Sequence, residues 1–197
     1  MLWTGASAFL LAMVGVLIST PLVVRGARAM DWVAYPRADR WHGQPTALMG
    51  GIAIYVAATL GLLLVVPVHD VWLIWTGASL MFVVGAVDDL AHIQPAAKLA
   101  AQVVATGLLL YAGYAFGVHW PLWLSLPLTL LWVIGITNAV NLLDNMDGLS
   151  AGIAGIAALV MTVFAALTGS ATTVVLGSAV GGAALGFLAF NFKPARI

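Results

Sequence analysis

A dense polar cluster interrupts this otherwise apolar chain at residues 138–152, NAVNLLDNMDGLSAG. Its first ten residues hold two aspartates and three asparagines, whereas 63% of the whole chain is hydrophobic and only 7% is charged. Asp144 and Asp147 are three residues apart, so on a helix or helical turn their side chains share a face. Asn138 and Asn141 continue this spacing on the N-terminal side. Capping of a following helix would use only one aspartate, so we interpret the cluster as groups that carry chemistry.

A second acidic group, Asp88 and Asp89, ends an apolar run, and Lys98 follows ten residues after the first of them. Adjacent carboxylates repel each other, and one aspartate at membrane depth costs about 2.5–3.5 kcal/mol. At the C-terminus of a helix, two acids also oppose the helix dipole. We therefore interpret this pair as groups that hold a cation or share a proton with a substrate, rather than as a solvated helix end.

A third polar segment, residues 35–51, reads YPRADRWHGQPTALMGG and carries Arg40 and His42 just before an apolar run. Mg²⁺ is typically held by one or two carboxylates and by phosphate oxygens of a substrate. Cationic side chains neutralise the remaining phosphate charge. The three segments together have the residue types needed for phosphoryl transfer, which depends mostly on positioning and charge neutralisation. The apolar setting indicates that one substrate is a lipid phosphate.

Apolar runs of roughly 17–24 residues, the length that a membrane-spanning helix requires, would position these groups. The seven expected spans cover residues 3–24, 46–66, 71–87, 99–117, 122–140, 149–168 and 172–190. We therefore predict an all-α fold, a polytopic transmembrane helix bundle that forms a single domain over residues 1–197. Glycines four residues apart predict close helix contacts. These pairs are Gly113/Gly117, Gly148/Gly152, Gly177/Gly181 and Gly182/Gly186.

All Lys and Arg residues fall on one side of this seven-span arrangement. They are Arg25, Arg28, Arg37, Arg40, Lys98, Lys193 and Arg196. The loops on the opposite side, near residues 67–70, 118–121 and 169–171, contain none. The positive-inside rule therefore predicts that the N-terminus is outside and the C-terminus is cytoplasmic. Every aspartate except Asp70 lies on the same side as the basic residues, so we expect the polar chemistry at the cytoplasmic face.

The motifs PxxDRWHGQPTALMGG, GAVDDL with a following KLAAQ, and NAVNLLDNMDGLSAG occur in this order. They resemble the prokaryotic polyprenyl-phosphate N-acetylhexosamine-1-phosphate transferases of glycosyltransferase family 4, the superfamily of phospho-MurNAc-pentapeptide translocase, over about residues 31–194. The resemblance implies transfer of an N-acetylhexosamine 1-phosphate from a UDP-sugar to polyprenyl (undecaprenyl) phosphate, with release of UMP and a requirement for Mg²⁺ or Mn²⁺. The DNM variant is closer to the UDP-GlcNAc enzymes than to the MurNAc-pentapeptide enzyme.

The resemblance also implies where the reaction takes place and what it serves. The enzyme would lie in the plasma (inner) membrane of a bacterium or archaeon, with a cytoplasmic active site. Its product would initiate a cell-envelope polysaccharide or a peptidoglycan lipid intermediate. Because family members are often dimers, the resemblance leaves a homodimer open. We expect no nucleic-acid partner.

Roles of single residues follow from the same resemblance. The residues that match catalytic carboxylates are Asp88, Asp89, Asp144 and Asp147. The expected metal ligands among them are Asp88, Asp89 and Asp147. The expected substrate-binding residues are Arg40, His42, Lys98 and Asn141.

The chain departs from the family pattern in two places. Many members have Arg-Lys before the histidine of the first loop, where this chain has Asp39 and Arg40. Members also have more spans, and after NFxPAxI they continue into a glycine–aspartate–glycine–serine motif that includes a metal-ligating aspartate, whereas this sequence stops at Ile197. We therefore expect the chain to be the N-terminal part of such an enzyme and to be inactive alone.

Two other classes of protein remain open. Acids inside a membrane often mark ion pathways, which would fit a transporter or an ion-conducting helix bundle with a cytoplasmic acidic site. Here, however, the acids sit at one face rather than at the midplane, and no second half of the chain repeats the first. A purely structural membrane subunit would leave the aspartate clusters without a cause.

Overall fold

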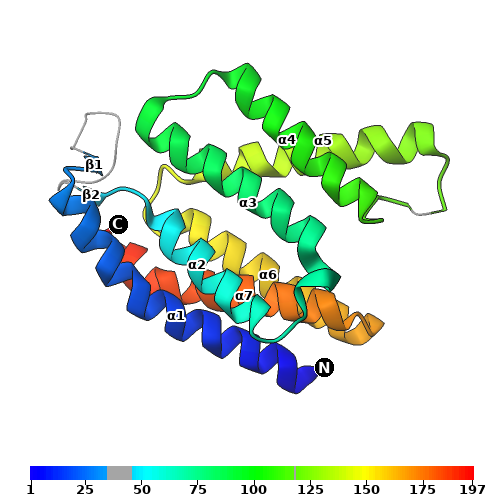
Figure 1. Cartoon of the computed structure of the whole chain (residues 1–197), viewed down its shortest axis with the longest axis horizontal. Helices are drawn as coiled ribbons and strands as arrows, with labels where there is room; N and C mark the ends of the chain where they lie inside the picture. Colours follow the sequence, from blue (N-terminus) through cyan, green and yellow to red (C-terminus); the bar gives the residue numbers. More distant parts are fainter. Residues whose placement is uncertain (35–45, 118) are drawn as a thin grey trace. The chain divides into compact units, whose positions relative to one another are not determined.

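The computed structural model describes residues 1–34, 46–117 and 119–197, and these residues are almost entirely helical (Figure 1). The helices of this part of the chain are α1 (Leu2–Ala29), α2 (Gly50–Leu63), α3 (Val68–Ala91), α4 (Pro95–Tyr111), α5 (Leu122–Leu143), α6 (Leu149–Thr168) and α7 (Ala171–Asn191). Each of the seven predicted spans corresponds to one helix. The prediction of an all-α, polytopic membrane protein is confirmed, while the orientation of the termini stays a prediction.

Five of the helices in the described ranges are long and apolar enough to cross a membrane, namely α1, α3, α5, α6 and α7. The predictions for residues 46–66 and 99–117 were wrong in extent. Helix α2 has 14 residues and would rise about 21 Å, less than the roughly 30 Å of a bilayer core. It starts late because Met49 has a left-handed conformation with φ 71°, and residues 46–47 form a strand. Helix α4 instead starts early, because Pro95 suits the first turn of a helix, and it has 17 residues.

The chain divides into two compact units. Unit 1 comprises Met1–Asp70 and Leu143–Ile197, and unit 2 comprises Val71–Leu142. Unit 1 contains α1, α2, α6, α7 and a two-stranded antiparallel ladder of β1 (Val33–Ala34) and β2 (Thr46–Ala47). Unit 2 contains α3, α4 and α5. The expectation of a single transmembrane domain stays a prediction.

Helix α7 forms the core of unit 1, with α1, α2 and α6 packed around it (Figure 1). Its buried residues are mostly small, which allows the helix backbones to approach each other closely. The pair Gly182/Gly186 faces α1, and the pair Gly177/Gly181 faces α6. A Cβ atom on Gly182 would collide with the backbone of Phe9. For these two pairs, the prediction of close helix contacts is confirmed.

The other two glycine pairs behave differently. Gly113 and Gly117 lie in the connection between α4 and α5 with φ of 88° and 55°, so their role is conformational and the predicted helix contact was wrong. The spacing of four residues cannot reveal the sign of φ. Gly152 has nothing within 4 Å of the position that a Cβ would take, whereas Gly148 packs against the end of α7.

In unit 2, the connection between α4 and α5 is fixed to α5 by polar and aromatic contacts. The Phe116 N–H donates to Thr129 Oγ1 (3.0 Å), and Ser125 Oγ donates to the Phe116 carbonyl (2.6 Å). The ring of Phe116 meets that of Trp132 edge-on, with centroids 5.5 Å apart. These contacts fix the connection against the first half of α5.

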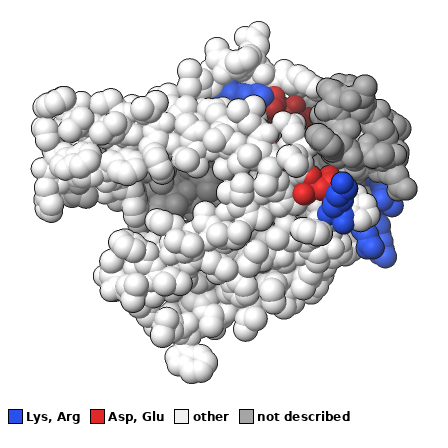
Figure 2. Space-filling view, turned by 180° about the vertical axis from the view of Figure 1, so that it is seen from behind, with Lys and Arg blue, Asp and Glu red and all other residues white. Residues whose placement is uncertain are grey.

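The molecular surface is rich in exposed apolar side chains. Trp3, Leu167 and Trp123 are 88%, 81% and 76% exposed. Most of the face drawn in Figure 2 carries neither acids nor bases. A soluble monomer rarely exposes large contiguous apolar patches, but a surface of this kind is suited to contact with lipid.

Candidate active site

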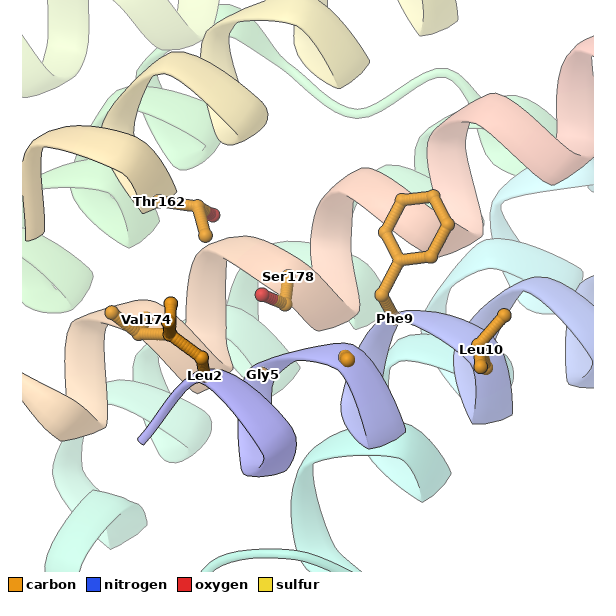
Figure 3. Close-up of a pocket in the computed structure, with 8 residues that line it drawn as sticks. Leu2, Gly5, Phe9, Leu10, Thr162, Val174 and Ser178 are labelled. Carbon is orange, nitrogen blue, oxygen red and sulfur yellow. The ribbon is translucent and has the colours of Figure 1, made fainter. Parts of the chain in front are cut away.

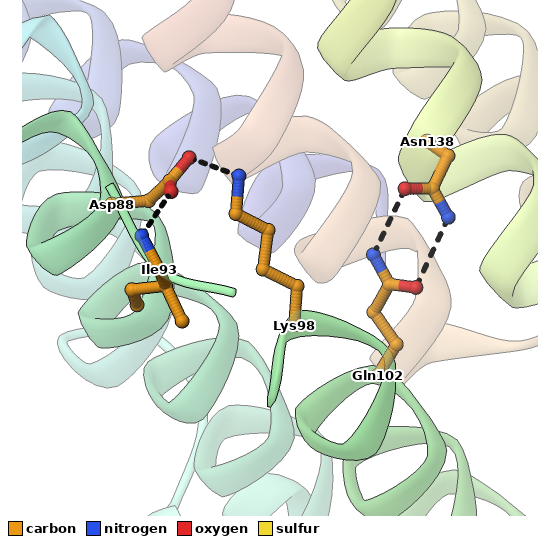
Figure 4. A network of polar contacts seen from close by, with 5 residues as sticks. All are labelled: Asp88, Ile93, Lys98, Gln102 and Asn138. Atoms are coloured by element: carbon orange, nitrogen blue, oxygen red, sulfur yellow. Dashed lines mark hydrogen bonds and ion pairs between the residues drawn. The ribbon is translucent and has the colours of Figure 1, made fainter. Parts of the chain in front are cut away.

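In unit 2, Asp88 connects the end of α3 to the start of α4 (Figure 4). Asp88 Oδ1 accepts a hydrogen bond from the Ile93 N–H at 2.9 Å. Its other oxygen, Oδ2, forms an ion pair with Lys98 Nζ in the first turns of α4. His92, with φ 49°, allows the sharp turn between the two helices. Asp88 therefore closes the turn and fixes the position of the Lys98 ammonium.

The two adjacent aspartates have different surroundings. The side chains of Asp88 and Lys98 are 25% and 34% exposed, so their ion pair is half-buried. Asp89 is exposed. A half-buried pair is less screened by water than a surface pair, and loss of one partner leaves the other charge uncompensated. Asp88 is thus committed to protein groups through both oxygens, while Asp89 faces outward.

A reciprocal pair of amides joins α4 to α5 in unit 2 (Figure 4). Gln102 Nε2 donates to Asn138 Oδ1 (3.3 Å), and Asn138 Nδ2 donates to Gln102 Oε1 (3.0 Å). Gln102 is only 6% exposed, and a buried amide needs hydrogen-bond partners. Sequence reasoning included Asn138 but missed Gln102. The available signal was the glutamine one helical turn after Lys98 in an otherwise apolar helix.

Asn141 is exposed in the last turn of α5, one turn after Asn138. Helix α5 ends at Leu143, and α6 begins at Leu149. The short connection between the two helices contains Asp144, which is exposed, and Asp147, which is half-buried. The polar cluster seen in the sequence therefore occupies the end of one helix and the loop that follows it.

In unit 1, the segment after α7 folds back onto this loop. Asp147 Oδ2 accepts a hydrogen bond from the Ala195 N–H (3.2 Å). Asn191 uses both ends of its amide: Oδ1 accepts from the Gly148 N–H (3.0 Å), and Nδ2 donates to the Ile197 carbonyl (2.6 Å). Sequence reasoning missed Asn191, although the NFxPAxI segment that contains it was noted. Asn191 holds the turn that carries the aspartates.

Gly148 is required at the start of α6 for two reasons. It is the N-cap residue with φ 73°, a left-handed conformation that residues with a side chain rarely adopt. A Cβ there would also stand 3.3 Å from the Phe192 ring and 3.5 Å from the Leu188 side chain. Gly148 occupies the N-cap position of α6, so neither Asp144 nor Asp147 is the N-cap residue of this helix.

Arg40 and His42 lie outside the described residues. The residues that flank their segment belong to unit 1, where Ala34 pairs with Thr46 and the Leu48 N–H donates to the Trp32 carbonyl (3.0 Å).

The start of α2 borders the segment that follows α7. A Cβ on Gly50 would lie 2.6 Å from the Phe187 ring and 3.3 Å from the Ile197 side chain. Ile197 itself is only 6% exposed. In unit 1, the start of α2 therefore lies at the same end as the contact between Asp147 and Ala195.

Residues 71–197 match the family model described as glycosyl transferase family 4. The chain belongs to this family. The matched region includes both aspartate pairs, Lys98, the Gln102–Asn138 pair and the segment that follows α7.

Several curated family 4 proteins are similar to most of the chain. A "probable undecaprenyl-phosphate N-acetylglucosaminyl 1-phosphate transferase" of Bacillus subtilis is 34% identical over 96% of this chain and 56% of its own length. A "decaprenyl-phosphate N-acetylglucosaminephosphotransferase" of Mycolicibacterium smegmatis is 32% identical over 84% and 48%. A "phospho-N-acetylmuramoyl-pentapeptide-transferase" of Moorella thermoacetica is 34% identical over 95% and 67%. The chain thus spans about half the length of the first two relatives.

The family 4 residues predicted from the sequence fall into both units. Unit 2 brings together Asp88, Asp89 and Lys98, with Asn141 on the neighbouring α5. Unit 1 holds Asp144 and Asp147. In unit 2 an ion pair joins Asp88 to Lys98, and in unit 1 both aspartates lie in the loop between α5 and α6. The meeting of the two carboxylate pairs around one ligand stays a prediction, as do the roles assigned to single residues.

Among the residues with described positions, no group of three or more His, Cys, Asp or Glu side chains is arranged to hold a metal ion. A site for Mg²⁺ does not need such a group, because this ion commonly uses one or two carboxylates and completes its shell with water and substrate phosphate. The exposed carboxylate of Asp89 in unit 2 is a group of that type.

A hollow in unit 1 lies near the start of α7, at the opposite end of this helix from Asn191 (Figure 3). It is lined by the first turns of α1, including Leu2 and Phe9, and by Val174 and Ser178 near the start of α7. Asn191 ends α7, which is 21 residues or about 30 Å long. Because the lining contains no charged residue, the hollow does not fit the handling of a phosphate.

Proposed function

We propose that the protein carrying this chain transfers an N-acetylhexosamine 1-phosphate from a UDP-sugar to a polyprenyl phosphate and releases UMP. The observation that carries the proposal is the 34% identity to the undecaprenyl-phosphate N-acetylglucosaminyl 1-phosphate transferase, which extends over 96% of this chain. The ion pair of Asp88 with Lys98 and the exposed carboxylate of Asp89 are suited to phosphate chemistry. The comparisons do not favour the alternative of a transporter.

In this reaction, an oxygen of the lipid phosphate attacks the β-phosphorus of the UDP-sugar. A new P–O bond forms there, and the bond from the β-phosphorus to the bridging oxygen breaks, so this oxygen leaves with UMP. Lys98 Nζ carries three N–H donors, and its bond to Asp88 leaves donors for phosphate oxygens. Asp89 is the exposed carboxylate of the pair, so it is the better placed to accept a proton from the lipid phosphate.

Mg²⁺ would neutralise charge on the diphosphate when bound. The sequence-based candidates for its ligands are Asp88, Asp89 and Asp147. Asp88 and Asp147 already accept hydrogen bonds from protein groups, so exposure favours Asp89 for direct contact. Asp144 is the exposed aspartate of the loop after α5. Asp147 would mainly fix the loop through its bond to Ala195.

We place the active site at the cytoplasmic face of a plasma membrane, with the N-terminus outside. The support is the distribution of Lys and Arg in the sequence, where all of them fall on one side of the seven predicted spans. Lys98 and the Asp88–Asp89 pair lie on that side. A water-soluble UDP-sugar and the phosphate of a lipid can meet at such a surface without either crossing the bilayer.

The test is release of UMP from UDP-GlcNAc by the protein in membranes, with undecaprenyl phosphate and Mg²⁺ added. Turnover should require all three components, and replacement of UDP-GlcNAc by UDP-glucose should reduce it strongly. Absence of UMP release with every UDP-N-acetylhexosamine and polyprenyl phosphate tried would contradict the proposal.

A further inference from the structure

The reciprocal amide pair of Gln102 and Asn138 lies beside the residues assigned to phosphate handling. Gln102 follows Lys98 by one helical turn on α4, and Asn138 precedes Asn141 by one turn on α5. We propose that Gln102 and Asn138 are positioning residues, which lock α4 to α5 in the register that presents Lys98 and Asn141 to the same substrate. This inference rests on the proposed function.

The amide pair joins α4 to α5 at one end of this helix pair, and at the other end the connecting loop is bonded to α5. At the loop end, Phe116 is bonded to Thr129 and Ser125. At the end that carries Lys98, the tie between the helices is the pair of hydrogen bonds between Gln102 and Asn138. Two parallel hydrogen bonds restrict rotation as well as distance. Slippage of α5 along α4 would therefore break both bonds and change the position of Asn141 relative to Lys98.

Gln102 is the buried member of the pair, whereas Asn138 is exposed. Gln102 is 6% exposed on an apolar helix, so its amide has little water with which to exchange partners. Asn138 is fixed further, because its Nδ2 also donates to the Ile134 carbonyl at 2.8 Å. Lys98 is thus held from two directions: Asp88 bonds its ammonium from α3, and Gln102 anchors its helix to α5.

The test exchanges the two amides. Gln102→Asn shortens one side chain by a methylene and Asn138→Gln lengthens the other, so each single variant breaks the matched pair, while the double exchange restores the combined length. We expect each single variant to lower kcat about 10–100-fold, as misplacement of reacting groups does. The KM for the UDP-sugar should change less than about threefold, because neither amide is assigned a contact with it. The double exchange should recover kcat to within about threefold of the unsubstituted protein. Gln94→Asn, at the exposed N-cap of α4, is the matched control.

Two activity results would overturn the inference: single variants with unchanged kcat, or a double exchange no better than the singles, which would indicate that the individual amides contact substrate. If the unsubstituted protein releases no UMP, the proposed function fails instead. Thermal unfolding of the unsubstituted protein, the two single variants and the double exchange then tests whether the two amides bond to each other. A double exchange with a Tm closer to the unsubstituted protein than either single supports it, and additive losses of Tm overturn it.

Discussion

At the scale of single residues, Asp88 and Asp89 show how neighbours in sequence can have different tasks. Asp88 accepts the Ile93 N–H and pairs with Lys98, so its charge is used inside the protein. Asp89 is exposed and has its charge available to a ligand. The sequence alone predicts that one acidic pair serves a cation or a proton, but it cannot divide the roles, because the division depends on which side chain reaches Lys98.

Replacement of the outward-facing acid gives the first prediction. Asp89→Asn should lower the rate of UMP release at least about 100-fold, since it removes a group proposed for proton transfer or metal contact. The Tm should change little, because the side chain is exposed. Asp70→Asn makes the same chemical change at the opposite end of α3 and should keep full activity. Equal activity of the Asp89 and Asp70 variants would contradict the role given to Asp89.

The inward-facing acid gives the second prediction. Asp88→Asn should lower both activity and Tm, because Lys98 loses its partner in a half-buried position while the Ile93 N–H keeps an acceptor. The loss of Tm should exceed that of Asp89→Asn by several degrees in thermal unfolding followed by circular dichroism. The reverse order would show that Asp89, not Asp88, is the structural acid.

At the scale of elements, the loop between α5 and α6 depends on the end of α7. Gly148 has a left-handed backbone and bonds to Asn191, and Asp147 bonds to Ala195. Hydropathy predicts the helices on both sides of this loop, since the apolar runs are long. It cannot predict the contact with residues 191–197, because the partners are more than 40 positions apart in the chain.

The third prediction concerns this loop. Gly148→Ala should destabilise the protein by about 1–2 kcal/mol, the cost of a left-handed conformation for a residue with a Cβ. The same change should lower activity, because the turn that carries Asp144 and Asp147 would shift. Gly152→Ala is the control: it lies inside α6 with open space around the new methyl group, so it should be neutral or stabilising by about 0.5–1 kcal/mol. Equal Tm values for the two variants would contradict this account.

Also at this scale, the errors in the sequence analysis have identifiable causes. The start of α2 was placed too early because Thr46 and Ala47 are apolar enough to extend a hydropathy run, yet they pair with β1. Gly113 and Gly117 have the spacing of a helix contact, but they serve a loop. Gln102 was missed because its partner, Asn138, is 36 residues away. In each case, a long-range pairing or the sign of φ outweighed a local pattern.

At the scale of the whole molecule, the arrangement in the membrane gives the fourth prediction. The chain has no Cys, so single cysteines can report the side on which a residue lies. Thr168→Cys, exposed at the end of α6, should react with an impermeant thiol reagent applied to intact cells. Gln94→Cys should react only after permeabilisation. The opposite pattern would place the aspartates outside and contradict a cytoplasmic site.

The central claim is that Asp89, the exposed acid at the end of α3, serves a metal-bound diphosphate. The most direct measurement is electron paramagnetic resonance of Mn²⁺ titrated into the protein with UDP-GlcNAc present. Asp89→Asn should weaken Mn²⁺ binding at least about tenfold, a loss of about 1.4 kcal/mol or more, while Asp70→Asn leaves it unchanged. Mn²⁺ binding that is the same with Asp89→Asn as with the unsubstituted protein would contradict the claim.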